Sequence, residues 1–245
     1  MNIALSTLAS ALASPSPWLL PLLSQAQHLA SNFDATSVAA ALNAARDPRA
    51  TPCFVEQSTL ADEPYESFIA RTGSIPTRDN LHDLFNGLMW LCFPRTKRRL
   101  NELQSREIER TGIANTRGVL RDALTLFDEN AALLQAPAVL VEALRRRDWR
   151  ALFIEQRALW QAARVVVFGH ALLEKLMQPR KAITAHVWLV DELTDDAVAA
   201  SLTERLTSKL FVPLPVLGIP GWWHANEDFA FYDDVEVFRP SRSRS

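Results

Sequence analysis

The segment RDNLHDLFNGLMWLCF, residues 78–93, carries the clearest helical pattern in the chain. At roughly 100° per residue, one broad face of this segment is apolar and consists of Leu81, Leu84, Phe85, Leu88, Met89, Leu91 and Cys92. The pattern predicts a helix over Pro76–Phe93 that packs this face into a core, with Thr77 as the N-cap and Pro94 ending it.

Helical periods continue on both sides of this segment. We expect further helices over residues 18–30, 35–46, 64–71, 96–110, 117–135, 138–147, 149–177 and 195–208, after a short helix or frayed start at the N-terminus. The exceptions are a short strand at Cys53–Val55 and a strand or buried extended segment at Ala182–Val190, where apolar and β-branched residues gather. From Phe211 the chain is rich in Pro, Gly and Trp and has no clear period, which predicts an ordered tail over the helices.

These segments predict a mainly α fold with at most a small β element. We expect one domain over residues 1–245, an irregular helical bundle in which residues 1–50 form N-terminal helices and residues 240–245 fray. Hydrophobic residues make up 48% and charged residues 22% of the chain, a balance typical of soluble globular proteins that excludes disorder and a disulfide scaffold.

Charge and cysteine usage narrow the function classes further. The net charge of −2 makes a general nucleic-acid binder unlikely, because such proteins carry a basic excess. No apolar run reaches the ~18 residues of a membrane span, and the first basic residue is Arg46, so a secretory signal is not expected. Cys53 and Cys92 do not form a paired metal motif and are expected to be free thiols. We therefore expect a cytoplasmic protein without a membrane partner.

The polar face of the 78–93 helix carries Asp79, His82, Asp83 and Asn86. A solvated surface would explain this face, but it lacks Lys, Glu and Arg beyond its first turn, and Trp90 projects within it. Two readings therefore stay open. The face is either exposed to solvent, or it is covered and brings catalytic side chains together.

A second polar pair lies in LWQAARVVVFGHALLEKLM, residues 159–177. Glu174 follows His170 by one helical turn, and both fall on a face that is otherwise apolar. A buried carboxylate needs a partner. That partner is either His170 itself, through a hydrogen bond, or a metal ion that both side chains bind.

Other segments add potential ligands. Glu129 shares a helical stripe with Asp122 and Thr125, whereas Asp128 points about 100° away and is interpreted as a surface charge or a helix-end ligand. His186 lies in an apolar segment. We expect one site in which the catalytic residues are His82, Asp83, Asn86 and Glu129, and the metal ligands are His170, Glu174, His82 and His186.

The cofactor expected at such a site is a divalent transition metal, although the sequence does not identify which one. The Glu-x-x-His pairs of di-iron carboxylate proteins and the His-Glu-x-x-His motif of zincin proteases are absent. Nucleophile-elbow, P-loop and dinucleotide-binding glycine motifs are absent too. A dense basic patch consists of Arg95, Lys97, Arg98 and Arg99. We interpret it as a solvated helix face, and the alternative is a contact with a phosphate or an acidic partner.

Several long strings resemble one known family. They are IPTRDNLHDLFNGLMWLCFPRTKRRLN, RDALTLFDENAALL, FGHALLEKL, ITAH and ANEDFAFYDDVEVFRP. In this order they resemble the bacterial family called domain of unknown function 3025, over roughly Phe54 to Pro240. The resemblance implies a compact, single-domain, cytosolic protein and supplies no activity or catalytic roles.

Two function classes follow from the residues. The first is a metal-assisted hydrolase or related enzyme that acts on a small molecule through the His/Asp/Glu cluster. The second is a non-enzymatic interaction or structural protein whose polar cluster is a buried hydrogen-bond network, with the basic patch and the tail serving a partner.

Overall fold

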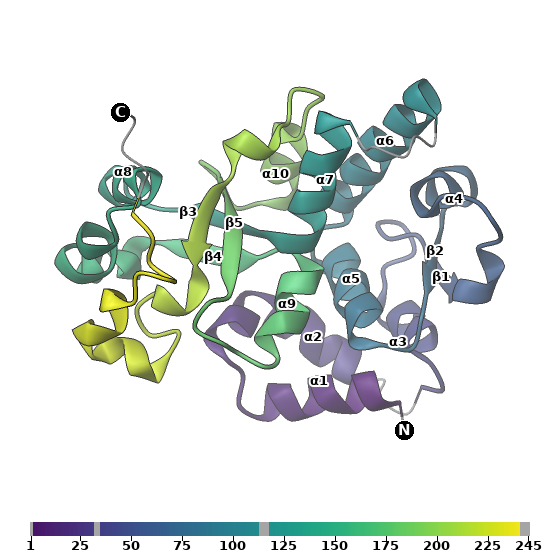
Figure 1. Ribbon diagram of the computed structural model, residues 1–245. Helices are drawn as coiled ribbons and strands as arrows, with labels where there is room; N and C mark the ends of the chain where they lie inside the picture. The colour runs from purple at the N-terminus through teal and green to yellow at the C-terminus, as the bar shows by residue number, and fades with distance from the viewer. Residues whose placement is uncertain (1, 32–34, 113–117, 241–245) are drawn as a thin grey trace.

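The computed structural model describes residues 2–31, 35–112 and 118–240. Its α-helices are α1 (Ile3–Ala13), α2 (Leu23–Ala30), α3 (Val38–Ala45), α4 (Tyr65–Thr72), α5 (Leu81–Cys92), α6 (Pro94–Thr111), α7 (Val119–Asn130), α8 (Ala138–Arg146), α9 (His170–Leu176) and α10 (Asp195–Ser201). Its strands are β1 (Cys53–Glu56), β2 (Ser74–Thr77), β3 (Ala131–Gln135), β4 (Arg164–Val167), β5 (Thr184–Leu189) and β6 (Val212–Pro215). Short 3-10 helices connect several of these elements, and Figure 1 shows their arrangement. Residues 241–245, which belong to the end expected to fray, lie outside the described residues.

The strands form two sheets, so the prediction of at most a small β element was wrong. Strands β1 and β2 pair in parallel, and a separate four-stranded sheet has the order β4-β3-β5-β6. In the larger sheet β3 runs parallel to β5, while β4 and β6 are antiparallel edge strands. The protein therefore has a mixed sheet at its centre rather than a helical bundle with a minor β element.

The largest error concerns residues 149–177, which do not form one long helix. A π-helical turn at Ala151–Glu155 and a 3-10 helix at Arg157–Ala162 lead into β4, and α9 begins only at His170. Strand β4 contains three consecutive valines, whose branched side chains favour extended backbone. The helix expected over 117–135 likewise ends at Asn130, because Ala131–Gln135 forms the buried strand β3.

Helix α5 begins later than the sequence predicts, because Asn80 and not Thr77 is its N-cap. The Asn80 Oδ1 atom accepts a hydrogen bond from the Asp83 amide at 2.8 Å. Thr77 lies in β2, and its hydroxyl donates to the Ile75 carbonyl. This change leaves the two faces of the helix unaltered.

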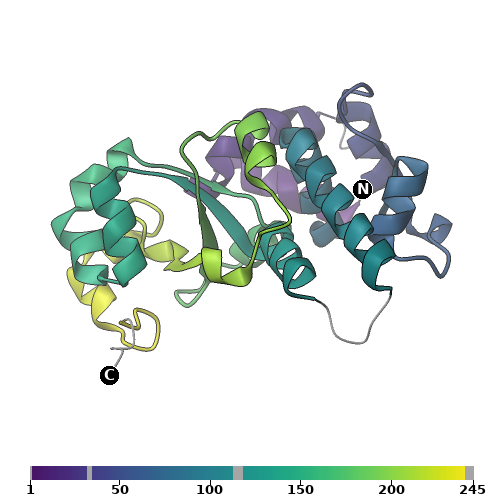
Figure 2. The same ribbon diagram turned by 90° about the horizontal axis from the view of Figure 1, so that it is seen from above.

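The four-stranded sheet lies between two groups of helices (Figures 1 and 2). Helix α8 and the C-terminal segment lie on one side, and α5, α6, α7 and α9 lie on the other. One cluster of buried apolar side chains extends from Ala4 to Phe238. Among the described residues, no single helix is long and apolar enough to cross a membrane; Ile3–Ala13 and Pro17–Ala30 would suffice only together, across a bend of 111°.

Candidate metal centre

Three helices on one side of the sheet bring polar side chains together. Helix α5 supplies His82, the C-terminal turn of α7 supplies Glu129, and α9 supplies His170 as its first residue. Helix α9 lies beside both α5 and α7 (Figure 1). The face of α5 that carries these polar residues is covered rather than solvated, since Asp83, Asn86 and Trp90 are all buried.

A glycine allows α9 to start this close to α7. A Cβ atom added at Gly169 would lie 2.5 Å from the Glu129 carbonyl oxygen and 2.6 Å from the Asn130 Cα atom, both of which are backbone atoms. The amide of Gly169 donates to the Ala131 carbonyl at 2.8 Å, which ties the start of α9 to the start of β3. Only glycine fits this contact, and the contact sets His170 beside Glu129.

Three ligand atoms face one another at the centre. The Nε2 atoms of His82 and His170 are 3.1 Å apart, and Glu129 Oε2 is 3.4 Å from His170 Nε2. All three groups offer atoms within 4.8 Å of one another, and the two imidazole rings meet edge to face at 76°. Two atoms bound to one tetrahedral or octahedral metal at about 2.0–2.2 Å would be about 2.9–3.5 Å apart. The two measured separations fall in that range.

A carboxylate lies on the outer nitrogen of each imidazole. Glu174 Oε2 is 3.1 Å from His82 Nδ1, and Asp128 Oδ1 is 4.0 Å from His170 Nδ1. Glu174 therefore contacts His82 on the neighbouring helix. The sequence had instead suggested His170, one turn earlier on the same helix, or a metal ion as its partner. Metal-binding histidines commonly donate their second N–H to a carboxylate as His82 can to Glu174, which fixes the ring orientation. His170 Nδ1 is buried and has no hydrogen-bond partner, because Asp128 is too far away for one.

Behind the imidazoles lies a buried ammonium group. Lys97 Nζ donates to Asp128 Oδ1 at 2.5 Å and to Asn86 Oδ1 at 2.8 Å, and the Lys97 side chain is only 4% exposed. The Asn86 amide in turn donates to the Tyr65 hydroxyl at 3.0 Å. Asp128 is thus no surface charge, and Lys97 does not belong to a solvated basic patch. The interpretations of Asp128 as a surface charge and of Lys97 as part of a solvated face were wrong, because α6 packs against α7 and buries the Lys97 side chain. The other interpretation of Asp128, as a helix-end residue, agrees with its place in the last turn of α7.

Burial and neighbouring charges set the protonation of the cluster. Burial lowers the pKa of His170 to about 4, although the Asp128 carboxylate opposes this shift, so the imidazole is neutral at pH 7. Burial disfavours ionisation of Asp128, yet Lys97 and His170 together hold its pKa below the usual value. Burial and the nearby Asp128 carboxylate raise the pKa of Glu129. Neutral imidazoles and ionised carboxylates are the forms that bind metal.

The remaining predicted site residues have other contacts. Asp83 accepts hydrogen bonds from the backbone and guanidinium group of Arg78, at 2.6–3.1 Å, and these bonds anchor the start of α5. Asn86 bridges Lys97 and Tyr65. His186 lies in β5 opposite Ala131, and the group of three potential ligands found among the described residues does not include it. Burial and the positive charge of Lys175 lower the pKa of His186.

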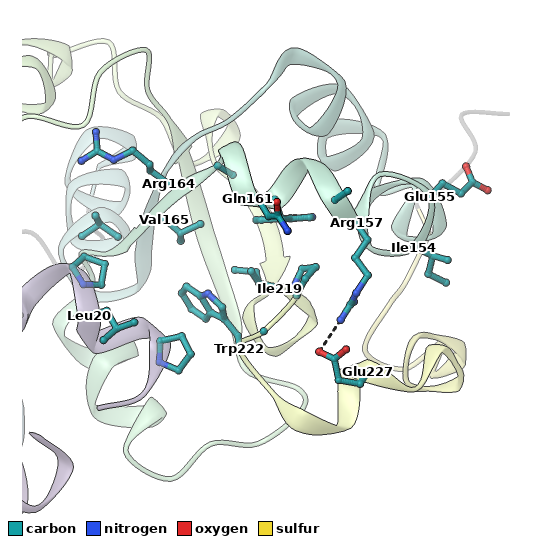
Figure 3. A pocket seen from close by; sticks show the side chains of 18 residues that line it. Leu20, Ile154, Glu155, Arg157, Gln161, Arg164, Val165, Ile219, Trp222 and Glu227 are labelled. Carbon is teal, nitrogen blue, oxygen red and sulfur yellow. Dashed lines mark hydrogen bonds and ion pairs between the residues drawn. The ribbon is translucent and has the colours of Figure 1, made fainter. Parts of the chain in front are cut away.

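Two cavities differ in their relation to this centre. One, of about 780 Å³, is lined by Glu174 and by Leu81, the residue before His82, and so adjoins the centre. The larger one, of about 1000 Å³, lies elsewhere, near Trp222, Leu20 and β4 (Figure 3). Its Arg157 is paired with Glu227 at 3.0 Å. None of the three potential ligands lines either cavity. The smaller cavity is therefore the one with a lining residue, Glu174, in contact with His82.

Comparisons with known proteins identify a family and do not indicate an activity. A family model described as "Protein of unknown function (DUF3025)" matches residues 53–242, which include the entire cluster. No curated protein and no solved structure matches the chain significantly.

Proposed function

We propose that this chain, which belongs to the DUF3025 family, binds one divalent transition metal through His82, Glu129 and His170 and uses it to hydrolyse a small molecule. One observation carries the proposal. Each imidazole directs Nε2 toward the other ring, and a carboxylate lies 3.1 Å from His82 Nδ1 and 4.0 Å from the otherwise unpartnered His170 Nδ1.

The protons available to the two imidazole rings support a cation between their Nε2 atoms. If His82 donates its Nδ1 proton to Glu174, its Nε2 atom is a bare acceptor. If His170 then donates its Nε2 proton to His82, its own Nδ1 atom faces the Asp128 carboxylate with no proton between them. A metal at the Nε2 atoms removes this conflict, because both Nδ1 atoms then carry protons that face carboxylates.

The donor set matches hydrolytic metal sites. Catalytic zinc is commonly held by three protein ligands, such as two histidines and a glutamate, with water in the open position, and the bound metal lowers the pKa of that water to about 7. The same donors also hold iron(II), so the identity of the metal is left to experiment. The side chains of His82 and Glu129 are 31% and 32% exposed, which leaves the centre open to a substrate, whereas His170 is buried.

The other residues hold the centre in place. Glu174 orients His82, and Lys97 keeps Asp128 ionised beside His170. Asn86 and Tyr65 extend this support, so we assign Asn86 a positioning role rather than a catalytic one. Asp83 anchors the start of α5. We place the enzyme in the cytoplasm, where the free thiols Cys53 and Cys92 would stay reduced.

A second candidate is a structural role without metal. The observation that favours it is the Lys97 ammonium, which already supplies Asp128 and Asn86 with a positive partner. In that case the cluster only fixes the packing of α5, α6, α7 and α9.

Metal analysis and a hydrolysis assay separate the two. The protein is purified without chelator or affinity-tag metal, and its Zn, Mn and Fe contents are measured before and after loading. Loaded wild type, His170→Ala and the exposed control His224→Ala are then melted and tested on p-nitrophenyl acetate. The proposal predicts about one metal per chain, a metal-dependent rise in melting temperature, and hydrolysis, all lost in His170→Ala and kept in the control. A folded wild type that takes up no metal would favour the structural role.

A further inference from the structure

We propose that the cavity beside β4 is a docking groove for an extended peptide of a partner protein. The peptide adds as a further strand to the free edge of the four-stranded sheet and carries an acidic side chain that binds Arg164. This inference goes beyond the metal function and does not depend on it. It is drawn from the hydrogen-bond pattern of the sheet and from the charges that line the cavity.

The outer edge of β4 has backbone groups that the sheet does not use. Backbone groups of an antiparallel strand point alternately toward and away from the partner strand. Because the Phe168 amide donates to the Ala131 carbonyl at 3.0 Å, Val166 faces β3, whereas Val165 and Val167 face away from it. Val167 is fully buried, but Val165 is only half-buried and lines the cavity. Among the described residues, no backbone group outside the sheet bonds to Val165, so its N–H and C=O can pair with an added strand.

The opposite edge of the sheet is closed to such pairing. The Val216 amide donates to the Ile183 carbonyl at 3.1 Å, so by the same alternation Leu214 faces β5, and Pro213 and Pro215 face outward. Proline has no N–H to donate, and proline on an edge strand blocks the addition of another strand. Strand β4 contains no proline. The sheet therefore protects the edge at β6 and leaves the edge at β4 able to pair.

The cavity provides space and apolar walls along β4 (Figure 3). The 3-10 helix Pro17–Leu22 lies beside β4, and the cavity of about 1000 Å³ is lined by residues of both. Further lining residues are Trp160, Ile219 and Trp222. Alternate side chains of a strand point to the same side. An added strand with an apolar side chain at every second residue would therefore pack against these walls.

Charges in the lining favour an acidic side chain in the peptide. Arg157 is paired with Glu227 at 3.0 Å, and Glu155 is paired with Arg150 at 3.0 Å. Arg164 is exposed and, within the described part of the chain, has no side-chain hydrogen bond or ion pair. Figure 3 shows it at the opposite end of the lining from Glu155. A guanidinium binds a carboxylate with two parallel hydrogen bonds, so the groove is complementary to an acidic residue at this end.

The same charge argues against a second copy of this chain as the occupant. If the β4 strands of two copies paired antiparallel about Val165, their Arg164 side chains would be diagonal neighbours across the pair. Like charges at that separation repel each other. A peptide with an acidic residue beside the one that pairs with Val165 has the opposite, favourable charge.

Selection from a peptide library tests the groove without a known partner. A phage-displayed library of linear heptapeptides is selected on the intact protein, and the enriched peptides are synthesised with a fluorescein label. Fluorescence polarisation gives their dissociation constants. We expect the enriched peptides to contain Asp or Glu and to have apolar or β-branched residues at alternate positions.

Variants of β4 show where these peptides bind. Val165→Pro removes the outward N–H and no hydrogen bond to β3, so it should weaken binding about 10-fold or more, whereas Val165→Thr keeps the N–H and should bind like wild type. Arg164→Gln should weaken binding about 3- to 10-fold. Arg145→Gln, an exposed arginine on α8 that does not line the cavity, is its control. Melting temperatures show whether each variant is folded.

N-methylation of the peptide repeats the test on unaltered protein. In an added strand every second amide faces β4, so methyl groups on those amides should weaken binding about 10-fold, and methyl groups on the intervening amides should be tolerated. This alternation decides the question even if Val165→Pro does not fold.

Three results would overturn the proposal. They are a selection that enriches no peptide, undiminished binding by folded Val165→Pro, and a methylation series without alternation. Sedimentation of wild type and Val165→Pro provides a further check. A wild-type dimer that dissociates in Val165→Pro would make a second copy the occupant, and the partner peptide would be wrong.

Discussion

His82 Nε2 and His170 Nε2 lie 3.1 Å apart although 88 residues separate them in the chain. The contact exists because α9 starts at His170 against the end of α7, and because α5 lies beside α9. Two imidazole nitrogens that face each other in a largely buried setting need a proton or a metal between them. Our proposal places a metal there, with Glu174 orienting His82 through its outer nitrogen.

Removing the buried lysine should destabilise the protein strongly. Lys97→Met leaves Asp128 without its cation in a largely buried position, which should cost about 3–5 kcal/mol of unfolding free energy. Urea denaturation of the metal-free protein measures this loss. The double variant Lys97→Met/Asp128→Asn should recover part of it, because the stranded charge is gone. Arg98→Met, an exposed neighbour, serves as the control, and an equal loss there would refute a specific role for Lys97.

Adding one methyl group at the start of α9 should disturb the centre. In Gly169→Ala the new Cβ atom meets the backbone of Glu129 and Asn130 at 2.5–2.6 Å, so α9 must move. We expect a loss of about 1–3 kcal/mol in unfolding free energy and weaker zinc binding by competition with a chromophoric chelator. Gly118→Ala is the matched control, because its Cβ atom would find only an ordinary contact at 3.5 Å. Unchanged zinc affinity in Gly169→Ala would show that this approach does not set the site.

Glu174 should increase the affinity for zinc without being required for zinc binding. Glu174→Gln keeps the shape but weakens the acceptor for His82 Nδ1, so zinc affinity should fall about 10- to 100-fold while the stoichiometry stays at one. The chelator competition assay measures both quantities. Glu142→Gln, which alters an exposed ion pair on α8, should leave them unchanged. Complete loss of zinc in Glu174→Gln would instead make Glu174 a direct ligand.

The stability of the metal-free protein should fall in mild acid. The unfolded chain protonates His170 near pH 6.5, whereas the native protein does so only near pH 4, so the unfolded state binds more protons between these values. We expect wild type to lose about 1–2 kcal/mol more than His170→Gln between pH 6.5 and pH 5. Urea denaturation in the presence of EDTA measures both stabilities. Glu129 is present in both proteins, so the comparison reports on His170. Parallel pH profiles would contradict the buried neutral imidazole.

The structure brings together His82, Glu129 and His170 of the predicted site, but their surroundings differ from those that the sequence predicted. Helical spacing predicted the polar face of α5 that carries His82, because the periodicity of this segment alone determines which residues share a face. The partner of Glu174 was missed, because it lies on another helix and no local pattern encodes that distance. Lys97 was misjudged because lysine is rarely buried, and only the packing of α6 on α7 reveals its partner.

Of the central sheet only β5 lies in a segment predicted as a strand or extended, and β3 and β4 were missed for a different reason. Val165–Val167 and Ala131–Leu134 are apolar throughout, and short apolar runs are compatible with either a buried helix or a buried strand. Their pairing in the sheet decides between the two, and that pairing is a long-range contact. Gly169 was the available local signal, since a glycine within a supposed long helix favours a break there.

X-ray absorption at the zinc edge tests the central claim most directly. On wild type loaded with one equivalent of zinc and dialysed, we predict two imidazole nitrogens and oxygen ligands at about 2.0–2.2 Å, from His82, His170, Glu129 and water. His170→Ala should retain no zinc after the same dialysis, whereas His224→Ala should give the wild-type spectrum. Wild-type protein that retains no zinc after dialysis, or a zinc environment with no imidazole nitrogen, would contradict the proposed centre.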